Sequence, residues 1–175
     1  MDSIKHLLPA TLTTDRLVLT TPTLAHVPEM AVLANSKAIY EVLSRLPHPY
    51  DESDGVFFVE NIARGPEEFA WAILLDGQFI GTIGLHLLPD LLPELGYWLG
   101  EPFWGQGYAT EAAIAVVAAA KAAGLPALRS RALLGNAGSR GVLRKAGFSE
   151  IGEGVDKQGT LVGQRMALMR LDFAR

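Results

Sequence analysis

The stretch Trp104-Gly-Gln-Gly-Tyr-Ala-Thr-Glu-Ala112 follows a short apolar segment and leads into a helix rich in alanine and valine. Residues 94–99, just before it, have the pattern of a β-strand. Gly105 and Gly107 carry no Cβ, so the backbone N–H groups of the loop can approach a ligand closely. These groups lie where a helix begins, and partial positive charge there favours phosphate. The stretch therefore predicts a strand–loop–helix junction that binds a pyrophosphate.

Two common phosphate-binding motifs do not fit this stretch. A Walker loop requires Gly-Lys followed by Ser or Thr, which is absent. A dinucleotide-binding fingerprint requires a third Gly or Ala where this chain has Thr110. The alternative is an ordinary tight turn between a strand and a helix. Trp104, Tyr108 and the apolar helix that follows favour the binding site over that turn.

Composition bounds the class of protein. A chain of 175 residues fits one domain, expected over residues 1–175. Its 49% hydrophobic content excludes a disordered chain. Fifteen basic against 19 acidic residues give a net charge of −4, which argues against a nucleic-acid partner. No cysteine is present, so a disulfide framework, a thiolate zinc site and a cysteine nucleophile are excluded.

Location and metal content follow from weaker signals. The first residues lack the apolar core of a signal peptide. The apolar run 112–120 is far shorter than the ~18 residues of a membrane span. The four histidines show no metal-ligand spacing. We therefore expect a cytoplasmic protein with no membrane partner and no metal.

Working outward from residue 94, the rest of the chain alternates strands and helices. Asp76-Gly77 is a strong hairpin signal, and Gly124 with Pro126 predicts a helix end. The order predicts an α/β (α+β) fold with a mixed, mostly antiparallel sheet and helices on both faces. The helix of residues 108–123 is expected to be buried on most sides. Strands are expected at 16–20, 69–75, 78–87, 94–99, 128–134, 149–155 and 162–171, and helices at 23–33, 36–46, 51–62, 108–123 and 136–147.

Two further segments add to the central stretch. Asn136-Ala-Gly-Ser139 is followed by a helix ending in Lys145-Ala-Gly-Phe148, and Thr14-Asp-Arg-Leu-Val-Leu19 lies near the start. Together the three segments resemble the GNAT N-acetyltransferases, in the branch of the ribosomal-protein N-terminal acetyltransferases. That branch often has Trp-Gly-x-Gly-Tyr-Ala-Thr-Glu-Ala, which residues 104–112 match throughout. The wider superfamily motif begins with Gln or Arg, a place occupied here by Trp104, as is common in the branch.

The resemblance implies the GNAT fold and an acyltransferase that uses acetyl-CoA as cosubstrate. It implies that the backbone amides of the loop and the Thr110 hydroxyl bind the pyrophosphate. It also implies that pantetheine pairs with the strand before the loop as an added strand would. Asn136 would contact the cofactor. It is also a strong candidate to cap its helix, and both roles can hold because backbone and side-chain groups differ. Arg140, Arg144 and Lys145 form a basic cluster, and Arg144 is expected to contact the 3′-phosphate. The alternative is that the cluster is a solvent-exposed helix face. The residues implied are Gly105, Gln106, Gly107, Tyr108, Ala109 and Thr110 for the loop, and Tyr97, Trp98 and Leu99 for the strand.

Catalytic residues are assigned by the same resemblance. Ser139 would lie near the sulfur and protonate the leaving thiolate; an ordinary helix serine is the alternative. Glu94, at the start of the strand beside the thioester, is the best general base and can act through water; an ordinary surface residue at a strand end is the alternative. His86 is the second choice for this role. Glu111 is expected to serve the helix dipole and packing.

The expected reaction is transfer of acetyl to a primary amine, a protein N-terminus or a small molecule, by direct attack in a ternary complex. The acceptor pocket is expected within residues 33–61, with Tyr40, His48, Tyr50 and Phe57 as candidates. A non-catalytic CoA-binding module is the alternative function, and a longer acyl donor is a second alternative. Either a monomer or a homodimer is compatible with the sequence.

Overall fold

The computed structural model describes residues 2–43 and 45–174. Eight strands form one sheet in the order β1-β2-β3-β4-β5-β6-β8-β7, with antiparallel pairing at every junction except the parallel β5–β6 pair. The mixed, mostly antiparallel sheet expected from the sequence is confirmed. The strands are β1 (Leu12–Thr13), β2 (Leu17–Thr20), β3 (Glu68–Leu75), β4 (Gln78–His86), β5 (Glu94–Leu99), β6 (Ala127–Leu133), β7 (Ser149–Val155) and β8 (Arg165–Asp172).

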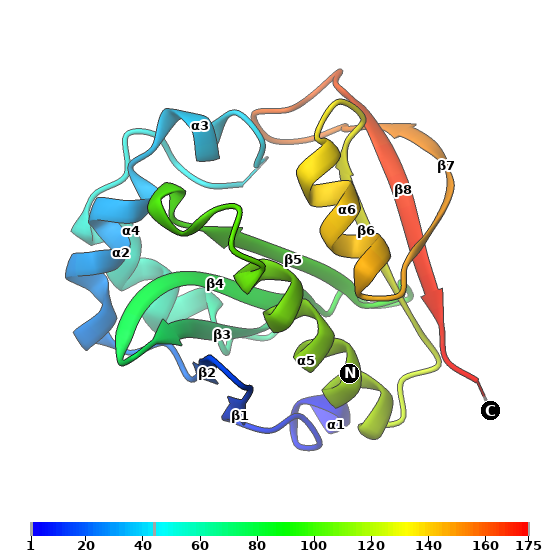
Figure 1. Cartoon of the computed structure of the whole chain (residues 1–175), viewed down its shortest axis with the longest axis horizontal. Helices are drawn as coiled ribbons and strands as arrows, with labels where there is room; N and C mark the ends of the chain where they lie inside the picture. The colour runs from blue at the N-terminus through cyan, green and yellow to red at the C-terminus, as the bar shows by residue number, and fades with distance from the viewer. Residues whose placement is uncertain (1, 44, 175) are drawn as a thin grey trace.

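Helices cover both faces of this sheet. Figure 1 shows α5 and α6 on one side of the strands, and α2 and α4 gathered at the other end of the molecule. None of the helices in the described residues combines the length and apolar composition that a membrane crossing requires. The helical segments are α1 (Asp2–Lys5), η1 (Leu24–His26), α2 (Val27–Ala34), α3 (Lys37–Tyr40), α4 (Glu52–Phe57), the π-helical turn η2 (Phe58–Ile62), η3 (Glu101–Phe103), α5 (Tyr108–Ala122) and α6 (Ala137–Lys145).

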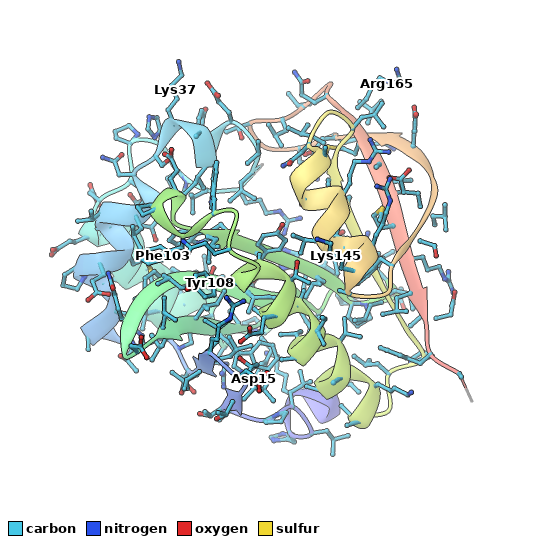
Figure 2. The ribbon with its side chains drawn as sticks, in the orientation of Figure 1. Asp15, Lys37, Phe103, Tyr108, Lys145 and Arg165 are labelled. Atoms are coloured by element: carbon cyan, nitrogen blue, oxygen red, sulfur yellow. The ribbon has the colours of Figure 1, made fainter. Side chains whose placement is uncertain are left out.

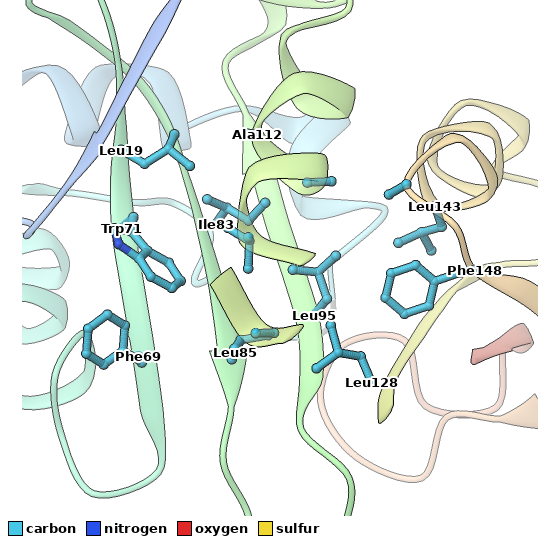
Figure 3. Close-up of a cluster of buried hydrophobic side chains, with 14 of the residues drawn as sticks. Leu19, Phe69, Trp71, Ile83, Leu85, Leu95, Ala112, Leu128, Leu143 and Phe148 are labelled. Atoms are coloured by element: carbon cyan, nitrogen blue, oxygen red, sulfur yellow. The ribbon is translucent and has the colours of Figure 1, made fainter. Parts of the chain in front are cut away.

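Strand alternation divides the core into two clusters. The larger one packs α5 and α6 against the sheet through residues such as Trp71, Leu95 and Leu143 (Figure 3). The smaller one lies under α2, α3 and the segment after α4, and contains Phe79 and Trp98. Successive residues of a strand point to opposite faces, so the sheet presents one apolar surface to each set of helices.

The turn and cap signals in the sequence are confirmed. Asp76 and Gly77 both have positive φ, 49° and 80°, as a tight hairpin between β3 and β4 requires. Gly124 ends α5 with φ of 87°, and the Asn136 side chain accepts a hydrogen bond from the Ser139 N–H at 3.1 Å. Asp51 caps α4 in a reciprocal capping box with Asp54.

One expectation about a helix was wrong in extent. The helix expected over 36–46 ends at Tyr40, because the Val42 N–H turns back to the Ile39 carbonyl three residues earlier. The chain then runs on so that Leu43 and Leu46 pack against the smaller cluster. Helix α5 is buried or half-buried on most sides, as expected. It leaves one stripe exposed, namely Ile114, Ala118, Lys121 and Ala122.

Candidate active site

The site begins where β5 and β6 separate. The two strands are in register at one pair only, Glu94 and Arg129. Beside it, the Ser130 hydroxyl donates to the Leu95 carbonyl at 2.7 Å, which closes the narrow end of the opening. Within the part of the chain that the structure describes, β5 has no partner strand on the β6 side beyond Leu95. An extended chain of ligand can therefore pair with β5 as an added strand.

The loop after β5 has the geometry of an anion cradle. Gly105 and Gly107 adopt φ of 76° and 84°, a conformation that glycine adopts without strain. The first regular bond of α5 runs from the Glu111 N–H to the Gly107 carbonyl at 3.0 Å. Within the described residues, the amides of positions 105–110 have no acceptor. This row of free N–H groups fits the pyrophosphate of CoA.

Two residues near the N-terminus, Thr14 and Arg16, hold this loop in place through Glu111. The Glu111 carboxylate accepts hydrogen bonds from the Thr14 hydroxyl at 2.5 Å, from the Arg16 N–H at 2.9 Å and from Arg16 Nε at 2.8 Å. Arg16 also donates to the Gln106 carbonyl at 3.0 Å and lies 4.4 Å from the Tyr108 ring centroid. Burial alone would raise the pKa of Glu111, but the hydrogen bonds from Thr14 and Arg16 outweigh it and lower that pKa.

Trp104 supports the loop from its other end. Its indole Nε1 donates to the Leu99 carbonyl at 2.6 Å, which links the last residue of β5 to the loop. About half of the Trp104 side chain stays exposed, and it lines the cavity described next. Trp104 therefore holds the junction together at the place where the wider superfamily has Gln or Arg.

A cavity of about 1080 Å³ joins these features. It runs from the 105–110 loop and α6, along β5, to the segments between α3 and β3. Figure 2 shows Tyr108 at the start of α5 and Lys145 near the end of α6; both residues line this cavity. Most of the residues that the sequence assigns to the site line it together: Glu94, Tyr97, Trp98, Leu99, Gly105, Gly107, Tyr108, Ala109, Thr110, Asn136 and Ser139.

Two assigned residues lie outside the lining of this cavity. The Gln106 side chain turns back to the Pro102 carbonyl, while its own carbonyl accepts from Arg16. Arg144 pairs with Glu150 at 2.6 Å on the surface. Its neighbour Lys145 lines the cavity instead. The expected contact between Arg144 and the 3′-phosphate stays a prediction.

Tyr97 and Ser139 meet across the opening. The Tyr97 hydroxyl donates to Ser139 Oγ at 3.3 Å, which leaves the serine hydrogen free to point elsewhere. Burial raises the pKa of the Tyr97 phenol, although the hydrogen bond with Ser139 acts in the opposite direction, so the phenol remains a donor. Trp98 points to the opposite face and packs on Phe79 at 5.8 Å between ring centroids, as strand alternation predicts.

Charged residues line up across the ends of the strands. Glu68, His86 and Glu94 are successive partners in register on β3, β4 and β5, and His86 Nδ1 is 3.7 Å from Glu68 Oε1. Glu94 pairs with two guanidinium groups, Arg129 at 3.2 Å and Arg131 at 3.4 Å. A carboxylate offers about four lone-pair sites, so these two contacts leave room for a water.

Arg131 continues the row to the loop between β7 and β8. It pairs with Asp156 at 3.2 Å, and Asp156 is 3% exposed with its second oxygen unpaired. Sequence reasoning missed Arg129 and Arg131. Their signal was the spacing of two arginines two residues apart on one strand, which places both on one face.

Only one of the four acceptor-pocket candidates lines the cavity. Tyr50 does so and is 6% exposed. Tyr40 and His48 instead stack on each other at 5.0 Å, and the Phe57 side chain is 58% exposed. Phe58, the neighbour of Phe57, lines the cavity in its place. Phe57 is the last residue of α4, and Phe58 begins the π-helical turn that follows.

Comparison with known proteins gives a consistent result. The sequence profile of the acetyltransferase (GNAT) domain matches residues 16–149. No curated protein sequence matches the chain. Among solved structures, the microcin C7 self-immunity acetyltransferase MccE, in complex with acetyl-CoA and AMP, superposes with a TM-score of 0.82 at 20% identity. The match covers 95% of this chain and 98% of that one.

Two further solved structures are similar as well. RimL, a ribosomal L7/L12 α-N-protein acetyltransferase in complex with CoA, gives a TM-score of 0.81 at 16% identity and covers 95% of this chain and 97% of that one. RimJ from Mycobacterium smegmatis gives 0.76 at 18% identity, covering 89% and 81%. At these identities the likeness shows a shared fold.

Proposed function

The chain belongs to the GNAT acetyltransferase family, with acetyl-CoA as its cosubstrate, and we propose that it acetylates a primary amine by direct attack in a ternary complex. One observation supports this most strongly. A single cavity connects the free amides of residues 105–110, the open edge of β5, the Tyr97–Ser139 pair and Glu94. These are the groups needed to bind pyrophosphate, align pantetheine, protonate a thiolate and accept a proton from an amine.

In the proposed mechanism, the loop amides and the Thr110 hydroxyl bind the pyrophosphate, and residues 97–99 pair with pantetheine. A β5 backbone N–H polarises the thioester carbonyl and stabilises the oxyanion that forms there. Asn136 contacts the cofactor near the start of α6. The contact between Arg144 and the 3′-phosphate belongs to the same proposal.

The reaction itself makes one bond and breaks another. The amine nitrogen attacks the thioester carbon, and the C–S bond then breaks as the amide forms. Glu94 accepts the proton lost by the amine through a bridging water. Ser139 gives its hydroxyl proton to the departing thiolate and takes a proton in return through its hydrogen bond from Tyr97, whose phenol is reprotonated from solvent.

The competing function is a CoA-binding module without catalysis. It would keep the loop and the β5 edge but would not depend on Ser139 or Glu94. RimL and MccE are named acetyltransferases, and their fold supports the catalytic proposal by analogy only. The expected cytoplasmic location, the absence of nucleic-acid partners and the oligomeric state stay predictions.

Thiol release from acetyl-CoA, measured against a panel of amines and N-terminal peptides, tests the proposal. We expect release that depends on an acceptor and falls about 100-fold in Ser139→Ala or Glu94→Gln. Ser149→Ala, an exposed serine at the start of β7, is the matched control and should keep full activity. Acetyl-CoA binding without release for any acceptor would support the binding module instead.

A further inference from the structure

The part of the cavity on the side of α2–α4 has a distinct chemistry. We call it the acceptor chamber, because pantetheine would occupy the opening between β5 and β6. Its walls are mainly apolar and aromatic. Ile39, Tyr50 and Trp98 are at most 9% exposed, and they pack in the smaller core cluster together with Leu46 and Phe58. Burial raises the pKa of Tyr50 to about 12, so this phenol stays neutral. The walls suit an uncharged hydrocarbon or aromatic body.

One end of the chamber is acidic. Glu67, Glu68 and Glu94 line it near the ends of β3, β4 and β5, together with His86. Arg131 also lines this end and pairs with Glu94 and Asp156, and Arg129 pairs with Glu94 as well, so the negative charge of this end comes mainly from Glu67 and Glu68. The carboxylates therefore favour a single ammonium group arriving close to the thioester. Among the described residues on the α2–α4 side, the other charged lining residues are Glu41 and Arg45, one of each sign, while Lys145 lines the cavity on the α6 side.

A segment from the far end of the sheet closes the chamber. Residues 156–164, between β7 and β8, reach across to the segment after α3, where the Thr160 hydroxyl donates to the Leu43 carbonyl at 3.0 Å. Leu161 in this segment is 6% exposed and lines the cavity. The pairing of Asp156 with Arg131 fixes the segment to β6. This contact joins the segment 156–164 to the segment after α3 across the mouth of the chamber. It therefore limits the width of an acceptor that can enter.

From these three features we propose that the acceptor is a small primary monoamine with an apolar or aromatic body. This inference rests on the proposed function and narrows its acceptor. The ammonium group enters the acidic end, loses its proton there and attacks the thioester, while the body lies against Tyr50, Phe58 and Trp98. A polyamine would place its second charge against apolar walls, which is costly. A protein N-terminus would have to pass beneath the contact between Thr160 and Leu43.

A matched set of acceptors tests this class. Hexylamine and hexamethylenediamine have the same chain length and differ by one terminal ammonium. Phenylethylamine adds an aromatic body, and short peptides beginning with serine or alanine represent protein N-termini. We expect kcat/KM for hexylamine and phenylethylamine to exceed that for the diamine and the peptides by about tenfold or more.

A pair of adjacent phenylalanines provides the variant and its control. Phe58→Ala removes a ring that lines the chamber, whereas Phe57→Ala removes an exposed ring outside it. We expect Phe58→Ala to lower kcat/KM for phenylethylamine about tenfold, with the KM for acetyl-CoA unchanged. Phe57→Ala should leave both constants unchanged. Calorimetric titration of phenylethylamine into the CoA-loaded protein should show a negative heat-capacity change, the mark of apolar burial, and weaker binding in Phe58→Ala.

The outcomes separate the two proposals. Thiol release that favours the diamine or the peptides overturns the acceptor class and leaves the transferase intact. Equal losses in Phe57→Ala and Phe58→Ala overturn the role of the chamber wall. Absence of thiol release with every acceptor overturns the proposed function and this inference with it.

Discussion

At the scale of single residues, Glu111 is the contact point between two segments of the chain 95 residues apart. Its two oxygens accept three hydrogen bonds from Thr14 and Arg16, and Arg16 in turn holds the Gln106 carbonyl. The arginine also neutralises a carboxylate that would otherwise repel pyrophosphate at the start of α5. The family stretches 14–19 and 104–112 thus act together as one support for the loop.

We predict that Glu111→Gln weakens acetyl-CoA binding. Losing charge-assisted hydrogen bonds that hold the loop should raise the KM for acetyl-CoA roughly three- to tenfold, with a smaller change in kcat. Steady-state kinetics checks this. Glu153→Gln removes a comparable ion pair with Arg165, away from the cavity, and should leave this KM unchanged. An unchanged KM in Glu111→Gln would show that the hydrogen bonds of Glu111 with Thr14 and Arg16 do not position the loop.

The same carboxylate predicts a pH dependence of stability. Folding lowers the pKa of Glu111 below its ordinary value of 4.5. Its contribution to the free energy of unfolding is therefore present above about pH 4.5 and is lost as the pH falls through the folded value. Denaturant unfolding should find Glu111→Gln less stable than the wild type at pH 7, with the difference shrinking toward pH 3. A constant difference would contradict this assignment.

The choice of base is also decided by single residues. Glu94 is held by two arginines, while His86 beside it faces Glu68. We expect Glu94→Gln to lower kcat/KM about 100-fold and His86→Gln less than tenfold, since only Glu94 accepts the proton of the amine. Both variants should still bind acetyl-CoA in a calorimetric titration. A larger loss in His86→Gln would transfer the role of base to the histidine.

At the scale of elements, the loop before α5 depends on its glycine conformations. Gly107 has φ of 84°, and a Cβ built there would lie 3.3 Å from the Arg16 side chain. Gly107→Ala should raise the KM for acetyl-CoA about tenfold, because an alanine strains this backbone by about 1–2 kcal/mol. Gly124→Ala places the same strain at the end of α5, outside the cavity lining. It should lower the melting temperature and leave the KM unchanged; a similar rise in KM for both variants would contradict the assignment.

The elements themselves were largely predictable from local signals. Local residue types predicted a hairpin turn at Asp76-Gly77, a helix end at Gly124 and a helix cap at Asn136. The structure has all three. The segment 36–46 was not predictable in this way. Its apolar spacing is typical of a helix. The helix ends at Tyr40, however, and Leu43 and Leu46 pack against the smaller core cluster, a contact that depends on the tertiary structure.

The site was predictable where a motif was contiguous in the sequence. The loop, β5 and Ser139 come together in one cavity as expected. Contacts between distant segments could not be read from the sequence. These include Arg16 with Glu111, Arg131 with Glu94 and Asp156, and Thr160 with Leu43. Each joins polar groups whose local sequence equally suits solvent exposure, so only the tertiary packing brings them together.

At the scale of the whole molecule, acetyl-CoA should stabilise the fold. The residues proposed to bind acetyl-CoA lie on β5, α5 and α6. These elements pack together with the rest of the sheet in the larger core cluster. At 100 times its dissociation constant a ligand contributes about 2.7 kcal/mol. For a chain of this size, that corresponds to a rise in melting temperature of roughly 5–10 °C. Thermal unfolding with and without acetyl-CoA checks this, and an unchanged melting temperature at saturating acetyl-CoA would contradict binding to the folded state.

The absence of cysteine from the whole chain removes the thiol nucleophile that a covalent acyl-enzyme would use. Direct attack requires that acetyl-CoA and the amine occupy the cavity together. The initial rate of thiol release, measured while both acetyl-CoA and the amine are varied, tests this central claim most directly. The account predicts double-reciprocal lines that intersect, as for a ternary complex. Parallel lines, or a rate independent of the amine, would contradict it.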